Sequence, residues 1–212
     1  MKKNALIIVD PQNSFCPGGE LAVADGEKIM PVIMECEALS MFDVIVVTRD
    51  NHPKDHMSFV TQHDGKNVLD VVKIMNPETG KEVELILWPE HCVEGTFGAQ
   101  FHKDIVLNSI DPEYELFTKG TNRYEHPFSG FAGKNSKGEF LEGYLKGQVI
   151  TDIYVCGLAT DYCVKDTIVD AISLGFNTYL IKDAAKGVAE DLAPTYAELI
   201  EKGAAIITSS HL

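Results

Sequence analysis

The sequence predicts an α/β fold: a doubly wound, six-stranded parallel sheet with helices on both faces. Two observations support this prediction. Short, continuous apolar runs alternate along the chain with segments of helical periodicity. Polar residues suited to chemistry follow several of these runs directly, as they do at the carboxyl edge of a parallel sheet. The length of 212 residues fits a single domain, residues 1–212, with a substantial core.

The composition is that of a globular protein, with 45% hydrophobic and 24% charged residues. A formal net charge of −14 argues against nucleic acid or an anionic membrane as a partner, because phosphate binding needs clustered Lys and Arg. No apolar run approaches the roughly 20 residues of a membrane span, and the start of the chain lacks the features of a signal peptide. Five cysteines without a CxxC pair indicate reduced thiols. We therefore expect a cytoplasmic protein; the sequence leaves its oligomeric state open, a homo-oligomer included.

The first half of the chain begins with apolar runs typical of strands buried on both faces. In chain order we expect strands at 5–9 and 44–48, a helix at 26–41, a hairpin within 67–88 and a short helix at 98–103. Asp25 is a plausible N-cap for the first helix. The hairpin is a small excursion from the sheet, and the hairpin and its loops carry the candidate metal ligands described below.

The second half continues the alternation of strands and helices. We expect strands at 115–118, 153–156, 177–181 and 204–208, and helices at 139–146, 161–174 and 194–202. Residues 120–138 are polar and contain glycines, and this length without periodicity predicts a loop that could act as a lid.

The segment VCGLATDYCV, residues 155–164, predicts a nucleophile. A strand ends there, Gly157 permits a tight turn, and Thr160 and Asp161 are residue types that cap helices. Cys163 would then lie in the first helical turn, where the helix dipole and free N–H groups lower a thiol pKa and can bind an oxyanion. The alternative is a buried structural cysteine, because free Cys is among the most buried residue types.

Three charged residues follow other predicted strands and should lie on the same edge of the sheet as this turn. They are Asp10, Asp50 and Lys119. A carboxylate such as Asp10 can take a proton from a thiol, and the Lys119 ammonium can stabilise a thiolate. Each residue taken alone has a simpler reading: a helix cap or surface carboxylate for Asp10, and a solvated charge for Lys119.

Asp50, His52 and His91 form a candidate metal site. One carboxylate and two imidazoles suit a divalent Zn, Fe or Mn ion with open positions. The D-x-H spacing alone is more often a hydrogen-bonded loop than a ligand pair. His56 is a fourth candidate, expected behind the ligands. The remaining histidines, His63, His102, His126 and His211, are expected to be surface or loop residues.

The motifs together resemble the nicotinamidases of the isochorismatase-like cysteine hydrolase superfamily. The segments that carry the resemblance, in the family's order, are IVDPQNSFCPGGEL, TRDNHPKDHMSF, WPEHCVEGT, FTKGTNRYEHPFSGF and VCGLATDYCV. The resemblance covers nearly the whole chain. Two departures are Asn51, where many relatives carry Trp, and the segment His126-Pro127-Phe128.

The resemblance implies a role for each matching position. The catalytic triad is Asp10, Lys119 and Cys163, and the metal ligands are Asp50, His52 and His91. The Leu158–Ala159 peptide bond is expected to be cis, with Leu158 in the substrate site and the N–H groups of Ala159 and Cys163 forming an oxyanion hole. Phe15 and Trp88 are expected to wall the pocket of the substrate ring; the simpler reading of either aromatic is ordinary packing beneath a loop.

The implied activity is metal-dependent hydrolysis of the small molecule nicotinamide to nicotinate and ammonia through a thioester. The implied cofactor is one divalent ion, zinc in the first place, with iron or manganese as alternatives. Two other functions fit parts of the pattern. One is a cysteine hydrolase of the same fold that acts on an N-carbamoyl amide or ureidoacrylate, with an isochorismatase as a weaker variant. The other is a non-catalytic binding protein on the same scaffold.

Overall fold

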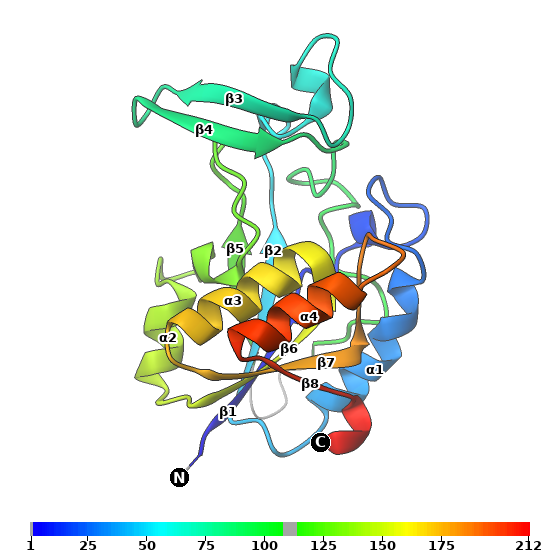
Figure 1. Ribbon diagram of the computed structural model, residues 1–212, viewed down its shortest axis with the longest axis vertical. Coiled ribbons are helices and arrows are strands. Elements are labelled where there is room, and N and C mark those ends of the chain that lie inside the picture. Colours follow the sequence, from blue (N-terminus) through cyan, green and yellow to red (C-terminus); the bar gives the residue numbers. More distant parts are fainter. Residues whose placement is uncertain (1, 108–113) are drawn as a thin grey trace.

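The computed structural model describes residues 2–107 and 114–212, and a parallel sheet lies at its centre (Figure 1). Within these residues the sheet has six strands in the order β5-β2-β1-β6-β7-β8. They are β1 (Asn4–Val9), β2 (Val44–Asp50), β5 (Tyr114–Lys119), β6 (Asp152–Leu158), β7 (Asn177–Lys186) and β8 (Ala205–Ile207). Every pairing between them is parallel, so the predicted fold class is confirmed.

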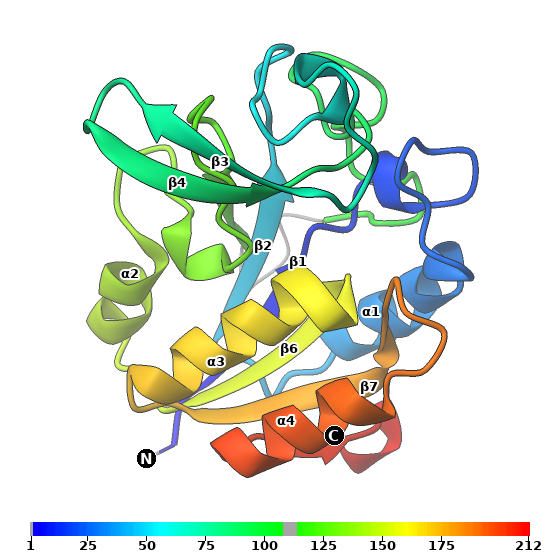
Figure 2. The same cartoon turned by 45° about the horizontal axis from the view of Figure 1, so that its top comes forward.

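Helices cover both faces of the sheet. Figure 2 shows α3 (Lys165–Ser173) and α4 (Ala193–Lys202) in front of it and α1 (Met30–Glu37) behind it. With α2 (Leu141–Gly147), α3 and α4 pack on the core that contains Ala5, Ile7 and Val9 of β1. Leu6 and Ile8 of the same strand point to the α1 side. This alternation explains why β1 reads as an unbroken apolar run. None of the helices in the described ranges has the length and apolar content of a membrane span.

The strand order reverses between β1 and β6. From β1 the chain adds β2 and β5 on one side, and then returns to place β6, β7 and β8 on the other. Doubly wound sheets bind ligands beyond the carboxyl ends of the strands at such a reversal. Gly157 near the end of β6 has a φ of +115°, and a side chain there would collide with the backbone of Val9. A glycine at this position therefore lets the two strands approach closely at the reversal.

The predicted hairpin is present and stands apart from the sheet. Strands β3 (Val71–Asn76) and β4 (Lys81–Ile86) pair antiparallel, beyond the carboxyl ends of β2 and β5 (Figures 1 and 2). Its small core contains Val72, Leu85 and Leu87. The candidate metal ligands lie outside the two hairpin strands: Asp50 ends β2, His52 follows it, and His91 lies in the loop after β4.

Two local predictions are wrong. Residues 98–103 form no helix, because their backbone carbonyls are engaged elsewhere: Asn13 N donates to Gln100 O at 2.9 Å and Ser14 N to Gly98 O at 3.0 Å. Asp25 does not cap the first helix with its side chain; it adopts a left-handed conformation, with φ of 59°, before a 3₁₀ turn that leads into α1. Both errors concern local geometry and leave the arrangement of the sheet unchanged.

Candidate active site

Three polar residues lie where the first strands of the sheet end. Asp50 and Lys119 are the last residues of β2 and β5, and the register of these strands pairs them directly. Asp10 follows β1, and its positive φ of 46° turns the chain away from the sheet. All three side chains are buried. Parallel strands bring their carboxyl ends to one edge, so the structure joins residues that lie far apart in the sequence.

The ammonium group of Lys119 links the two carboxylates to a thiol. Its Nζ lies 2.9 Å from Asp10 Oδ2 and 2.6 Å from Asp50 Oδ1, and it donates to Cys163 Sγ at 3.5 Å. Thr48 Oγ1 donates to the other oxygen of Asp10 at 2.6 Å. We call Asp10, Lys119 and Cys163 the nucleophile cluster.

Cys163 reaches this position on a tight turn. The chain leaves β6 through a cis peptide bond between Leu158 and Ala159, as the resemblance implied, and then forms a π-helical turn over Thr160–Val164. The N–H of Val164 donates to the carbonyl of Ala159 at 3.1 Å, and α3 follows directly. Single π turns inside helices are frequent at functional sites.

The predicted caps of this helix are wrong. Ala159 occupies the N-cap position, and no side chain caps the turn. The carboxylate of Asp161 instead accepts hydrogen bonds from the backbone N–H groups of Val188 at 2.9 Å and Ala189 at 2.8 Å. Asp161 therefore ties the turn that carries Cys163 to the loop after β7.

The predicted direction of the thiol pKa is also wrong. Burial raises the pKa of Cys163 well above its ordinary value, and the charge of Lys119 offsets only part of this effect. Burial also raises the pKa of Asp10, although Lys119 acts in the opposite direction. Burial lowers the pKa of Lys119, but the charges of Asp10 and Asp50 outweigh it and hold that pKa well above its usual range. The cluster therefore combines a neutral thiol with a carboxyl group of raised basicity and a permanent cation.

Four potential metal ligands gather beside the nucleophile cluster. Asp50, His52, His91 and His126 each offer one ligand atom, and these atoms all lie within 4.8 Å of one another. We call these four residues the metal cluster. Asp10, Asp50 and Cys163 also come within this distance of one another, but the ammonium of Lys119 already contacts all three.

The chemistry of the metal cluster fits a divalent cation. The two ring nitrogens of His52 differ in their contacts. Its Nδ1 contacts Gly120 O at 2.9 Å, whereas its Nε2 is buried and has no hydrogen-bond partner in the described residues. The Nδ1 of His91 likewise contacts Pro89 O at 2.8 Å, which leaves its Nε2 for a ligand. Imidazoles whose second ring nitrogen contacts a backbone carbonyl in this way are typical metal ligands.

Electrostatics favour the same conclusion. Burial, together with the charge of the neighbouring His52, lowers the pKa of His91 to about 3. Burial raises the pKa of Asp50, but the charges of Lys119 and His52 outweigh this effect and bring it well below its usual range. With Asp50 ionised, two buried carboxylates face the single ammonium of Lys119. A bound cation would compensate the remaining negative charge.

His56 lies behind the metal cluster. Its Nδ1 contacts Ser58 Oγ at 2.8 Å and its Nε2 contacts Glu125 O at 3.0 Å, so both ring nitrogens are engaged. Its ring centroid lies 4.5 Å from that of His52. His56 therefore supports a ligand and a loop.

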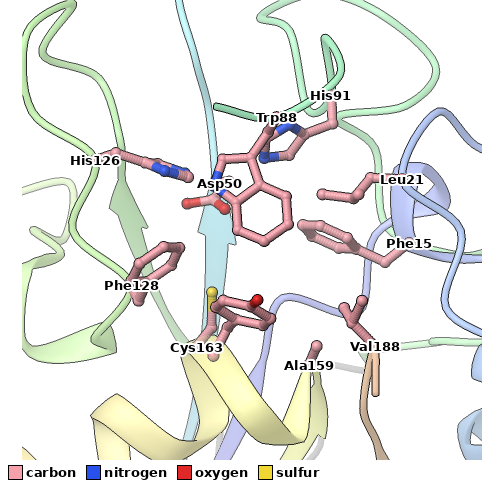
Figure 3. A pocket seen from close by; sticks show the side chains of 11 residues that line it. Phe15, Leu21, Asp50, Trp88, His91, His126, Phe128, Ala159, Cys163 and Val188 are labelled. Carbon is pink, nitrogen blue, oxygen red and sulfur yellow. The ribbon is translucent and has the colours of Figure 1, made fainter. Parts of the chain in front are cut away.

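An aromatic pocket opens above the thiol. Figure 3 shows Cys163 at its floor, with Trp88, Phe15 and Phe128 around it and Asp50, His91 and His126 on its far side. It encloses about 340 Å³ of non-atom space, its open mouth included. The remaining lining residues are Leu21, Ala159, Tyr162 and Val188. A pocket with aromatic walls and polar groups at one end suits a flat ring with a polar substituent.

Two sequence expectations about this region need correction. His126 lies in a loop, as expected, but it also belongs to the metal cluster, which was not expected. Leu158, expected in the substrate site, lies fully buried in the core on the α1 side, and its side chain does not line the pocket. The other expected surface or loop histidines, His63, His102 and His211, lie outside the cluster.

The walls Phe128 and Tyr162 were not predicted as site residues. The signal for Tyr162 was its place next to Cys163, and the signal for Phe128 was its place in the loop after Lys119. His126 lies in that same loop, seven residues beyond Lys119. These positions indicate site residues only when the ends of β5 and β6 are known to lie at the same edge of the sheet.

Comparison with known proteins places the chain in a family. The model of the isochorismatase domain matches residues 4–211. The chain belongs to the isochorismatase family. A nicotinamidase of Acinetobacter baylyi is 38% identical over 212 residues, which cover 98% of this chain and 94% of that protein.

Solved structures of isochorismatase-family proteins agree with this assignment. A nicotinamidase and pyrazinamidase of Acinetobacter baumanii matches with a TM-score of 0.84 and 35% identity, over 100% of this chain and 98% of that chain. A pyrazinamidase of Pyrococcus horikoshii, solved in complex with zinc, matches with a TM-score of 0.73 and 34% identity, over 97% of this chain and 99% of that chain. Within the isochorismatase family the chain therefore groups with the nicotinamidases, as its motifs implied.

Proposed function

We propose that this protein hydrolyses nicotinamide to nicotinate and ammonia, with Cys163 as the nucleophile and a thioester as the intermediate. The observation that carries the proposal is the ammonium of Lys119, which contacts Asp10, Asp50 and Cys163 beneath an aromatic pocket. The names of the relatives support the choice of substrate, because those with 38% and 35% identity are nicotinamidases. A pyridine ring between Phe15 and Trp88 would present its carboxamide to the thiol.

The first half of the reaction releases ammonia. Asp10 takes the proton of the Cys163 thiol, and the thiolate attacks the carboxamide carbon. Lys119 stabilises the thiolate by its charge. The tetrahedral intermediate collapses when the C–N bond breaks and Asp10 returns its proton to the leaving nitrogen. Ammonia departs, and the nicotinoyl group remains on Cys163 as a thioester.

The second half restores the enzyme. Asp10, again a carboxylate, takes a proton from water, whose oxygen attacks the thioester carbon. The C–S bond breaks, the proton on Asp10 returns to the sulfur, and the acid product loses its carboxyl proton to solvent and leaves as nicotinate. A single carboxyl group thus serves as base and acid in both halves, a role that its raised pKa suits.

Backbone donors would stabilise the oxyanion in both halves. The proposed donors are the N–H groups of Ala159 and Cys163, at the start of the turn that leads into α3. Removal of one such donor typically lowers the rate by about 10²–10³-fold.

Asp50, His52 and His91 are the residues that would hold a divalent ion. When bound, such an ion supplies a Lewis acid that can receive a ring nitrogen of the substrate. The zinc in the Pyrococcus relative supports zinc as the ion, with iron or manganese as alternatives that the same ligands accept. The ligand set thus orients the ring, and the nucleophile cluster performs the covalent steps.

Ammonia release from nicotinamide by the purified protein tests this function. We expect turnover by the wild type and a loss of about 10⁴-fold or more in Cys163→Ala. Cys36→Ala is the matched control, because Cys36 is a buried residue of α1 that does not line the pocket, and its replacement should leave turnover intact. Turnover retained by Cys163→Ala would contradict the mechanism. Hydrolysis of N-carbamoyl amides but not of nicotinamide would favour the alternative substrate class.

A further inference from the structure

His126 stands out because nothing in the proposed reaction uses it. Its ligand atom lies within 4.8 Å of those of Asp50, His52 and His91. Two donors on opposite sides of one ion, each at about 2.1 Å, are about 4.2 Å apart. The four atoms are therefore close enough together for a modest movement of the side chains to bring them around a single ion.

The ring of His126 makes no hydrogen bond to the part of the chain that the structure describes. Its Nδ1 is shielded from solvent and makes no hydrogen bond among the described residues. Figure 3 shows its ring directed toward Asp50 from the side of the pocket opposite His91. Its ring centroid lies 4.9 Å from that of His52 and 5.8 Å from that of His91. A buried nitrogen without a partner is unfavourable, and coordination to a cation would satisfy it.

The loop that carries His126 is held against the other ligands. Glu125 O contacts His56 Nε2 at 3.0 Å, and Met57 N donates to Arg123 O at 2.9 Å. The guanidinium of Arg123 contacts Asp55, with 3.1 Å between Nη1 and Oδ2. These bonds attach residues 123–125 to the segment that follows His52. The position of His126 is thus set by the segment that follows His52.

We propose that His126 is a fourth protein ligand of the divalent ion. The proposal rests on the metal site of the proposed function and extends it to a residue that was expected to have no role. One consequence concerns the pocket. Phe128 lies two residues further on, with its ring centroid 4.9 Å from that of His126, and forms a pocket wall. The ion would therefore attach the loop after β5 to the opposite side of the site and order this wall.

Metal affinity of the protein freed of metal is the decisive measurement. Zinc binding would be followed by competition with a chromophoric chelator for the wild type, His126→Ala and His126→Gln. We expect both variants to bind zinc at least about tenfold more weakly than the wild type. His91→Ala is the positive control, and it should weaken binding as well. His211→Ala is the matched negative control, because His211 lies in the C-terminal 3₁₀ turn, outside the metal cluster.

Two further readouts use properties other than activity. The X-ray absorption spectrum of the zinc-loaded wild type should be fitted by three imidazole ligands and not by two. This measurement uses the wild type alone, so it does not depend on whether a variant folds. Hydrogen exchange at residues 123–128 should slow on zinc loading in the wild type and much less in His126→Ala.

The outcomes separate this inference from the proposed function. Unchanged zinc affinity in His126→Ala, or two imidazoles in the absorption spectrum, would overturn the role of His126 while leaving the proposed hydrolysis intact. A raised KM with unchanged zinc affinity would assign His126 to the substrate instead. If the wild type bound no metal but hydrolysed nicotinamide, this inference and the metal site would both fail, and the cysteine chemistry would stand.

Discussion

The nucleophile cluster and the metal cluster are adjacent but are built in different ways. In the nucleophile cluster, Asp10 and Lys119 lie at the ends of sheet strands, and Cys163 lies on the turn that follows β6. In the metal cluster only Asp50 belongs to a strand, and the three histidines come from three separate loops. The register of parallel strands fixes the first arrangement, whereas contacts between loops fix the second.

One carboxylate joins the two clusters. Asp50 Oδ1 lies 2.6 Å from Lys119 Nζ, and its Oδ2 lies 3.6 Å from His52 Nε2. Gly120 adds a second point of contact, because a side chain there would collide with the His52 ring. The difference in construction implies that changes in the sheet should affect both clusters, whereas changes in the loops should affect the metal cluster alone.

Replacement of Lys119 should have the largest effect, because it removes the cation shared by both clusters. In Lys119→Met, Asp10 and Asp50 are left as buried carboxylates without their partner. We expect the free energy of unfolding to fall by about 3–5 kcal/mol and kcat/KM to fall by about 10³-fold or more. Urea unfolding and ammonia release measure the two effects. Lys134→Met is the control, since Lys134 is exposed; a stable, active Lys119→Met would refute the shared role.

Removal of the metal should affect only one cluster. After chelation and verified loss of metal, we expect kcat/KM for nicotinamide to fall by about 10²–10³-fold, because the Lewis acid provides several kcal/mol. The rate at which iodoacetamide alkylates Cys163 should stay unchanged, since Lys119 and Asp10 remain in place. Turnover that survives metal removal would favour the N-carbamoyl amide class of substrate. Altered alkylation would show that the clusters are not separable.

Thr48 offers a change confined to the nucleophile cluster. Its hydroxyl donates to Asp10 Oδ1 and lowers the pKa of that carboxyl. In Thr48→Val the ionised form of Asp10 loses this bond, so the pKa of Asp10 rises. As the pH falls, its carboxylate is therefore protonated at a higher pH than in the wild type. We expect kcat/KM on the acid side of the pH profile to fall roughly tenfold, with less change near the optimum. The apparent pKa of this acid limb is a property of Asp10 and Cys163 together, because the two groups exchange one proton.

The control for Thr48→Val is Thr178→Val, because Thr178 is also buried but bonds to Phe176 O. The acid limb of this control should match that of the wild type. An acid limb in Thr48→Val that coincides with the wild type would rule out Asp10 as the base.

The smallest effect is expected at Asp161, which supports the pocket wall from outside both clusters. Its carboxylate accepts from Val188 N and Ala189 N, and Val188 lines the pocket. These bonds are exposed, so Asp161→Ala should raise KM only a few-fold with kcat nearly unchanged. Asp183→Ala, which removes an exposed acceptor of β7 that bonds to Ser209, should change neither constant. A large fall in kcat would instead mean that Asp161 positions the thiol.

Much of the sheet and of the nucleophile cluster could be predicted from the sequence. The apolar runs at 5–9 and 44–48 marked strands buried on both faces, because such strands have no polar face to present. The alternation with helices implied parallel pairing, and parallel pairing brings Asp10, Asp50 and Lys119 to one edge. The hairpin followed from its own turn residues. These conclusions depend only on local pattern and chain direction.

The local structure outside the strands was harder to predict from the sequence. Residues 98–103 have a sequence compatible with a helix, but Asn13 and Ser14 bind their carbonyls from another segment. Asp161 has the residue type of a cap, yet its carboxylate bonds to the loop after β7. In each case a partner far along the chain competes with the local preference, and the sequence does not name that partner.

The sequence by itself determined the strands, their common polarity and therefore the meeting of Cys163, Asp10 and Lys119 at one edge. The tertiary structure alone decided that His126 joins the metal cluster and that Phe128 and Tyr162 line the pocket. It also reversed the direction of the Cys163 pKa, because desolvation depends on how completely other segments cover the thiol. Periodicity is a property of neighbours in sequence, whereas burial and coordination depend on neighbours in space.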